Sequence, residues 1–244
     1  MLIPRLNYSQ YQKESSRIIA ELQSELRIGS LCYIIENFPC SETDSALNEF
    51  TYALGEPVLE KRNRNNSSVY RVEINNHLSL PVYANTAYEF SGHTDCADFD
   101  NPPDTVVMLC ERPSEIGGDS FLVNLETVLE EFSFKDVQML NEPVYIFGKN
   151  YYPILSLKNT FLAIRYNRVY FDFCIRLNQL EIEPEKLELI NRLDNAINAC
   201  KYVFSLKSGD CLLLNNQRIL HGRESFPENS DRLIKRVRLN LFQD

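Results

Sequence analysis

Residues 236–241, RVRLNL, alternate polar and apolar side chains without a break. Successive side chains of a β-strand point to opposite faces, so this segment predicts a strand with one basic and one apolar face. The basic face carries Arg236 and Arg238, and Arg232 shares their parity. A guanidinium binds a carboxylate through two parallel hydrogen bonds, so this face suits a dicarboxylate ligand. A salt-bridged edge strand would show the same pattern.

Short segments rich in β-branched, aromatic and other large apolar residues recur from about residue 68 onward. Turn residues separate them, as in proteins built from many β-strands. They are SVYRVEI (68–74), TVVMLC (105–110), SFLV (120–123), PVYIF (143–147), TFLAI (160–164), YVFSL (202–206), CLLL (211–214) and KRVRLNLF (235–242). Because they do not alternate regularly with helices, they favour a sandwich or jelly roll over a doubly wound parallel sheet. We therefore expect a mainly β fold with flanking helices.

Apolar residues at helical spacing predict three of these helices. Gly29 would end the first helix, Ser41 would cap the second, and Pro184 would lie in the first turn of the third. Their buried stripes would be Tyr11, Ile18, Leu22 and Leu26; Leu47, Phe50 and Leu54; and Leu187, Ile190, Leu193 and Ile197. Residues 1–244 would form one domain, with a helical region of about 1–60 packed on a jelly-roll core of about 68–244.

Composition narrows the class of protein. The 244 residues are 44% hydrophobic and 24% charged, which is typical of a globular protein, and no apolar run approaches the length of a membrane span. A net charge of −9 argues against nucleic acid as a partner. The first residues lack an apolar signal core, and the seven cysteines form no CxxC pair. We expect a cytoplasmic protein with reduced thiols and a small-molecule ligand, and leave its oligomeric state open.

The segment GHTDCADFD (92–100) holds a candidate metal site. If it is extended, His93 and Asp95 leave the same face of a strand, and His221 is the candidate third ligand. Two imidazoles and one carboxylate form the facial triad of non-haem Fe(II) oxygenases, which leaves the opposite face of the ion open. A His-x-Asp pair alone is a weak signal, because such histidines are often only hydrogen-bonded surface residues.

Four sequence blocks, taken in their order along the chain, strengthen the case for a metal site. SGHTD (91–95), GGDSFLVN (117–124), NNQRILHGRESF (215–226) and DRLIKRVRLNL (231–241) resemble those of Fe(II)/2-oxoglutarate-dependent dioxygenases of the TauD/TfdA superfamily. Within it, the gamma-butyrobetaine hydroxylase and clavaminate synthase-like enzymes are the most similar in pattern. The resemblance implies a double-stranded β-helix, which is a cupin-like jelly roll, and covers roughly residues 83–244.

The resemblance also implies roles for six residues. Fe(II) would be held by His93, Asp95 and His221, and 2-oxoglutarate would be bound by Arg232, Ser120 and Arg236. Arg232 and Ser120 would contact the distal carboxylate of the co-substrate. The implied reaction couples dioxygen and the decarboxylation of 2-oxoglutarate, with release of succinate and CO2, to oxidation of an unactivated C–H bond, and hydroxylation is the expected outcome.

Substrate contacts are expected from Asn85, Tyr88, Arg165 and Asn167, with Tyr166 in the same run. Such side chains suit a small polar metabolite with a carboxylate, such as an amino acid or a derivative. Each also has a structural interpretation, as a turn, core or ion-pair residue. The chain has no Trp with which to build a large cage for a quaternary ammonium, so gamma-butyrobetaine itself is not expected.

Two other functions remain open at this point. The same ligands could hold a redox-inert metal in a cupin-like isomerase or hydrolase, or the jelly roll could be a non-catalytic ligand-binding module. Arg232 and Ser120 favour the oxygenase, because neither alternative needs a pocket for a dicarboxylate.

Overall fold

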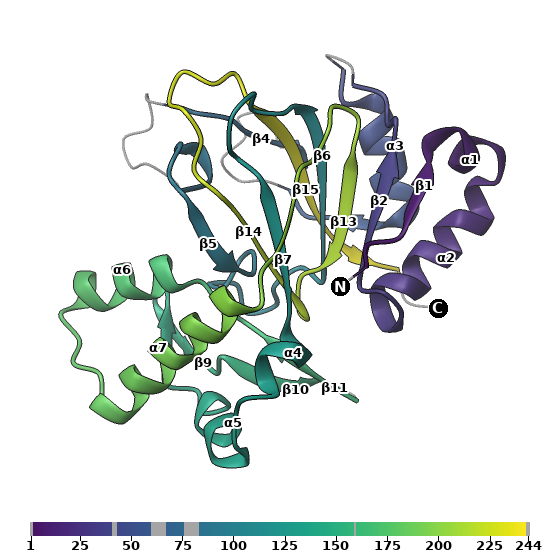
Figure 1. The fold of residues 1–244 in the computed structure, drawn as a ribbon. Helices are drawn as coiled ribbons and strands as arrows, with labels where there is room; N and C mark the ends of the chain where they lie inside the picture. The colour runs from purple at the N-terminus through teal and green to yellow at the C-terminus, as the bar shows by residue number, and fades with distance from the viewer. Residues whose placement is uncertain (1, 41–42, 60–66, 76–82, 159, 243–244) are drawn as a thin grey trace.

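The computed structural model describes residues 2–40, 43–59, 67–75, 83–158 and 160–242 (Figure 1). Two β-sheets lie face to face at its centre, with helices on their outer sides (Figure 1). The expectation of a mainly β fold with flanking helices is confirmed. None of the described helices combines the length and the apolar character that a membrane span requires.

The larger sheet has the strand order β1-β2-β13-β6-β15-β3, and β4 also pairs with β15. Its strands are β1 (Arg5–Asn7), β2 (Cys32–Glu36), β3 (Gly55–Pro57), β4 (Tyr70–Val72), β6 (Thr105–Arg112), β13 (Cys211–Asn215) and β15 (Leu233–Leu241). The pair β1–β2 is parallel, whereas the other strand pairs described in this sheet are antiparallel. The long strand β15 therefore crosses the sheet between β6 on one side and β3 and β4 on the other.

The smaller sheet has the strand order β12-β7-β14-β5 and is antiparallel throughout its described pairs. Its strands are β5 (Phe90–His93), β7 (Ser120–Asn124), β12 (Tyr202–Phe204) and β14 (Ile219–Arg223). Two separate hairpins, β8 (Tyr145–Phe147) with β9 (Asn150–Tyr152) and β10 (Leu155–Lys158) with β11 (Phe161–Ile164), lie outside both sheets. The strand-like segments 143–147 and 160–164 thus form strands, but not strands of the central sheets.

The space between the two sheets is filled by side chains from both. Leu122 and Ile219 of the smaller sheet share one buried cluster with Val106 and Leu212 of the larger sheet. Because side chains alternate along a strand, the neighbour Phe121 points to the other side and joins a different cluster. The alternation read from the sequence thus becomes an inner and an outer layer of the core.

Helices cover the outer face of each sheet. They are α1 (Tyr8–Lys13), α2 (Ser15–Ile28) and α3 (Ser45–Leu54) on the larger sheet, and α4 (Leu125–Leu129), α5 (Phe134–Leu140), α6 (Arg168–Asn178) and α7 (Pro184–Ala199) on the side of the smaller one (Figure 1). Leu22 of α2 and Phe50 of α3 are fully buried against the larger sheet, and Ile190 of α7 is fully buried on the other side. A 3-10 turn, η1, spans Tyr83–Asn85.

The predicted helices exist, but their details differ. The first is two helices, because the backbone of Glu14 leaves the helical region (φ −135°, ψ 40°). The second begins at Ser45, and Ser41, its predicted cap, lies outside the described residues. The third begins at Pro184 as expected, although Leu187 of its predicted stripe is 37% exposed. The helices α4, α5 and α6 were not predicted.

Candidate metal centre

The two histidines of the candidate site lie on neighbouring strands. His221 of β14 is paired directly with His93 of β5 in the antiparallel ladder. Contrary to the expectation of an extended segment, β5 ends at His93, and Asp95 lies in the turn that follows. There the backbone N–H of Asp95 donates to Asn216 Oδ1 (2.7 Å), and Asn216 Nδ2 donates to the Asp95 carbonyl (3.1 Å). This pair of hydrogen bonds fixes the turn and turns the carboxylate back toward the imidazoles.

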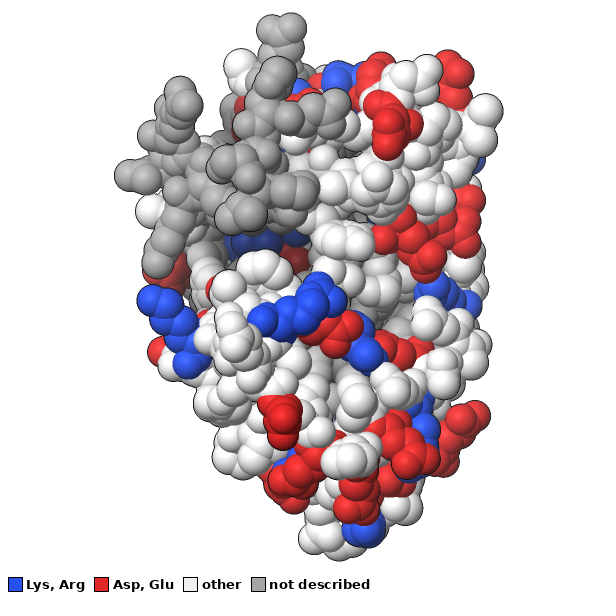
Figure 2. All heavy atoms as spheres, turned by 90° about the vertical axis from the view of Figure 1, so that its left-hand side faces the viewer, with Lys and Arg blue, Asp and Glu red and all other residues white. Residues whose placement is uncertain are grey.

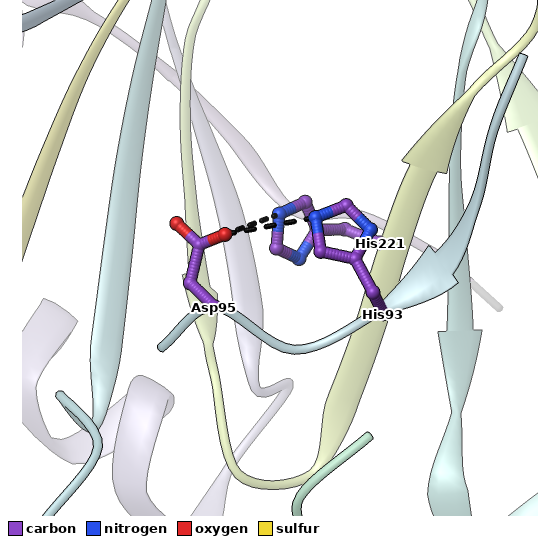
Figure 3. A group of neighbouring side chains, drawn as sticks. All are labelled: His93, Asp95 and His221. Atoms are coloured by element: carbon purple, nitrogen blue, oxygen red, sulfur yellow. Dashed lines mark ion pairs between the residues drawn. The ribbon is translucent and has the colours of Figure 1, made fainter. Parts of the chain in front are cut away.

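The three predicted ligands converge (Figure 3). Asp95 Oδ1 lies 3.6 Å from His93 Nε2 and 3.8 Å from His221 Nε2, and one potential ligand atom from each residue falls within 4.8 Å of the others. All three side chains are buried, with exposed fractions of 3–5%. Three ligand atoms that face one another in this way can bind one face of a metal ion.

A hydrogen bond to the backbone sets which nitrogen of His93 faces the candidate site. Its Nδ1 lies 2.9 Å from the Ser91 carbonyl, which can only accept, so Nδ1 carries the proton and Nε2 presents its lone pair to the site. His93 Nε2 is buried and has no hydrogen-bond partner among the described residues. Because such an atom is costly to bury unless something binds it, the arrangement fits an ion between the three side chains.

The protonation states also suit a metal. Burial, reinforced by His93 and by the nearby arginines and opposed by Asp95, lowers the pKa of His221 to about 3, so its imidazole is neutral at neutral pH. Burial opposes ionisation of Asp95, but the guanidinium groups of Arg236 and Arg238 outweigh it and hold the pKa of this carboxyl well below its usual range. A neutral imidazole and an ionised carboxylate are the forms that bind metal ions.

Two arginines of β15 hold the Asp95 carboxylate in place. Arg238 Nε donates to Oδ2 at 2.8 Å, and Arg236 Nη1 lies 3.1 Å from Oδ2 and 3.3 Å from Oδ1. The alternation of β15 puts both guanidinium groups on the face toward the smaller sheet, as the sequence predicts. With Oδ2 bound by Arg238, Oδ1 is the oxygen that faces His93 and His221.

A small cavity of about 50 Å³ adjoins His221. Its lining brings together Ser120, Arg232 and Arg236, the three residues expected to bind the co-substrate. Ser120 is 8% exposed and Arg232 is 6% exposed, so both polar groups lie inside the protein. Burial lowers the pKa of Arg232, and a bound anion would relieve the cost of burying its charge.

Arg223 lines the same cavity and was missed in the sequence. Its guanidinium donates to the Tyr88 carbonyl at 2.8 Å and to the Thr86 carbonyl, and it lies 4.5 Å from the centre of the Phe226 ring. Burial lowers its pKa to about 9. Its place two residues after His221 on one strand, on the same face, is the signal that could have found it.

A larger cavity of about 690 Å³ adjoins His93 and Asp95. It is lined by Val58, Leu59, Ser68, Tyr70, Tyr83, Ala84, Phe90, His93, Asp95, Cys96, Ala97, Asp98, Phe99, Asn167, Val169, Tyr170, Phe173, Arg176, Arg236 and Arg238. Ala84, Phe90, His93 and Arg236 line both cavities. The Phe90 ring stacks on the His93 imidazole, with ring centres 3.7 Å apart. Figure 2 faces this side of the molecule and shows charged groups recessed in a hollow of the surface.

Of the residues expected to contact substrate, Asn167 lines the large cavity, and it also caps α6 by accepting from the Tyr170 N–H. The Asn85 side chain is held by the Tyr70 hydroxyl (2.5 Å) and donates to the Glu73 carbonyl (2.8 Å). Asn85 is not among the residues that line the two cavities.

Three further residues of this set lie elsewhere. Tyr88 is 62% exposed and lines neither cavity. Arg165 donates to the carbonyls of Ala97 and Phe99, so it supports the segment that follows Asp95. Tyr166 is buried, and its hydroxyl donates to Asp194 (2.6 Å).

Comparison with known proteins agrees with this geometry. Residues 4–238 match the family model described as taurine catabolism dioxygenase TauD, TfdA family. The chain belongs to the TauD/TfdA family. Among curated proteins, the human and Pongo abelii gamma-butyrobetaine dioxygenases are each 25% identical over 181 residues, which is 65% of this chain and 46% of theirs. The chain thus spans about half the length of the curated relatives it matches.

Solved structures of two oxygenases have the same fold. The asparagine oxygenase AsnO superimposes with a TM-score of 0.76 at 17% identity, covering 94% of this chain and 79% of its own. The non-haem iron oxygenase OrfP, in complex with Fe and alpha-ketoglutaric acid, superimposes with a TM-score of 0.72 at 16% identity, covering 93% and 80%. The expected jelly-roll fold of the TauD/TfdA dioxygenases is therefore confirmed, with two facing sheets that do not close into a barrel.

Proposed function

We propose that this chain is an Fe(II)- and 2-oxoglutarate-dependent oxygenase that hydroxylates an unactivated C–H bond of a small amino-acid-like metabolite, with release of succinate and CO2. Family membership supports the class of reaction, and the AsnO and OrfP structures were solved with hydroxylated asparagine and arginine, respectively. In this proposal residues 1–244 act as one domain. His93, Asp95 and His221 would hold Fe(II), whose role when bound is to activate dioxygen at the open face of the triad.

The observation that carries the proposal is the small cavity beside His221. The buried residues Arg232 and Ser120 line it together with His93 and His221, two of the candidate metal ligands. Arg232 and Ser120 would bind the distal carboxylate of 2-oxoglutarate and so direct its other end toward the metal. Arg236 lines this cavity and also contacts Asp95, so it would link the co-substrate to the carboxylate ligand.

Other side chains would organise the site. Arg238 keeps one oxygen of Asp95 away from the metal, and Asn216 fixes the turn that carries Asp95. Asn167 would contact the substrate. Asn85 and Arg165 would support the site indirectly, because their side chains are hydrogen-bonded to backbone carbonyls of neighbouring segments. The three ligands are buried, and a buried environment strengthens each of these electrostatic contacts.

Turnover of 2-oxoglutarate tests the proposal. The Fe(II)-loaded protein in air should convert 2-oxoglutarate to succinate and CO2, and a true substrate should accelerate the conversion. The variant Arg232→Gln should raise the KM for 2-oxoglutarate by about 10-fold or more, because it removes a charge-assisted contact in a buried site. Lack of succinate under all conditions, with the metal bound, would favour a redox-inert isomerase, hydrolase or binding module.

A further inference from the structure

The large cavity follows one face of α6 away from the metal centre. The helix starts near the ligands, since the N–H of Thr94, which lies between His93 and Asp95, donates to the Tyr166 carbonyl at 2.7 Å. From there Val169, Tyr170, Phe173 and Arg176 line the cavity at helical spacing. At a rise of 1.5 Å per residue, this wall extends about 10 Å from Val169 to Arg176. One end of this wall therefore lies near the candidate metal ligands, and the other end is at Arg176.

The middle of this wall is aromatic. The Tyr170 and Phe173 rings lie nearly parallel, with an interplanar angle of 13°, and Phe173 keeps 43% of its surface exposed. Other apolar residues complete the lining, among them Val58, Leu59, Tyr83 and Phe99. A free polar amino acid could not use such a surface, whereas a ligand with an apolar segment would bury it favourably.

The end of this wall at Arg176 is positively charged. Of the three arginines in the lining, Arg236 and Arg238 contact Asp95, but Arg176 makes no side-chain hydrogen bond or ion pair within the part of the chain that the structure describes. Asp98, the other acid in the lining, is close to Tyr170 near the start of α6, where burial and then the Asp98 charge raise the pKa of the Tyr170 hydroxyl. Arg176 is thus an exposed cation of the lining that pairs with no acid among the described residues, and an anionic group would be attracted there.

We infer that the prime substrate is an elongated organic anion with its reacting carbon at the metal centre, an apolar middle along α6 and a terminal carboxylate at Arg176. This rests on the proposed function and narrows its amino-acid-like substrate to one with an apolar extension, larger than a free amino acid. The volume of about 690 Å³ agrees with it, because cavities of this size typically enclose ligands larger than a free amino acid. An amino acid that carries a long apolar substituent would fit the same description.

Matched pairs of probes test the inference. Anaerobic protein loaded with Fe(II) and 2-oxoglutarate is titrated with octanoate and octanamide, and with hexanoylglycine and hexanoylglycinamide, while the visible band of the metal chelate is followed. Each carboxylate should perturb the band at a concentration at least about fivefold lower than its neutral amide, which is the size expected for a partly exposed ion pair. Free asparagine and arginine serve as small polar comparators.

Three variants separate the contribution of the Arg176 charge from that of the aromatic wall. Arg176→Gln should abolish the difference between carboxylate and amide, whereas Phe173→Ser should weaken both probes equally. Arg17→Gln, which removes an exposed arginine of α2 that lies outside the lining of the cavity, should change neither. Equal binding of carboxylate and amide by the unaltered protein, unchanged discrimination in Arg176→Gln, or tighter binding of asparagine or arginine would overturn the inference while leaving the proposed function in place. If no band forms, the proposed function fails, and the inference fails with it.

Discussion

His93 and His221 face each other across two neighbouring strands, with paired Cα positions and ring centres 4.3 Å apart. In the sequence 127 residues lie between them, and antiparallel pairing of β5 with β14 brings them together. Each histidine has a glycine beside it in the sequence: Gly92 precedes His93, and Gly222 follows His221. The site is therefore built into the smaller sheet, and its properties depend on how closely that sheet is packed.

Gly222 gives a direct test of this packing. A Cβ at this position would overlap the Phe121 ring and the Phe90 carbonyl, neither of which can move freely inside the core. Gly222→Ala should therefore destabilise the protein by about 1–3 kcal/mol and weaken metal binding, as measured by urea unfolding and by metal titration. Gly29→Ala is the matched control, because its Cβ would meet only the flexible side chain of Glu25. Equal effects of the two substitutions would contradict this account.

Asp95 should be the carboxylate that binds the metal. Asp95→Asn keeps the shape of the side chain but removes its charge, so it should lower the affinity for Fe(II) by about 100-fold or more and abolish succinate formation. Asp100→Asn is the control, because Asp100 is exposed and accepts a hydrogen bond from the Tyr152 hydroxyl instead. Full metal affinity in Asp95→Asn would show that another carboxylate holds the ion.

Arg238 should determine how firmly that carboxylate is held. Arg238→Met removes the 2.8 Å hydrogen bond to Asp95 Oδ2, and partners of this kind typically change metal affinity by about 10- to 100-fold. Calorimetric titration with Mn(II) measures the effect without turnover. If affinity is unchanged and the fold is intact, Arg236 alone is sufficient to orient Asp95.

The metal-free protein should lose stability as the pH falls below neutrality. The pKa of His221 is lowered to about 3 in the folded state, whereas an unfolded histidine has a pKa near 6.5. Between these values the unfolded state binds the additional proton, so folding is weakened as pH decreases from about 6.5 toward 3. Urea unfolding should show a loss of about 2 kcal/mol between pH 7 and pH 5, reduced in His221→Gln. Identical pH dependence in the two proteins would refute this assignment.

Lys235 tests the opposite face of β15. Its side chain is 1% exposed and lies 2.7 Å from Glu111 and 2.9 Å from Asp44, so it links the start of α3 to the larger sheet. Lys235→Met leaves both carboxylates near the core without this cation and should cost about 3 kcal/mol of unfolding free energy. The double variant Lys235→Met, Glu111→Leu should recover part of that loss. A stability unchanged by the single substitution would show that solvent screens the pair.

The sequence was informative where a regular period or a short motif determines the geometry. The alternation around Val237 places Arg236 and Arg238 on one face of β15, and the spacing of His93 and Asp95 indicated two of the three converging side chains. The helix α7 was predicted from its apolar stripe, of which Ile190, Leu193 and Ile197 are buried in one core cluster.

Other features depend on contacts that no local pattern reports. The turn at Asp95 is held by Asn216, which lies 121 residues away in the sequence, so an extended segment was the simpler interpretation. The helix α6 is rich in aromatic and β-branched residues, which favour strands, and it folds as a helix because Phe171 and Cys174 are buried on one side. Its opposite face, with Phe173 and Arg176, lines the cavity and therefore had no buried stripe to read.

The most direct test of the central claim is the visible spectrum of the protein under anaerobic conditions with Fe(II) and 2-oxoglutarate. We predict a weak charge-transfer band that requires both additions, is lost in Asp95→Asn, and needs a higher concentration of 2-oxoglutarate in Arg232→Gln. A mixture that stays colourless while the protein is folded and binds Fe(II) would contradict the claim that the cavity beside His221 delivers 2-oxoglutarate to the metal.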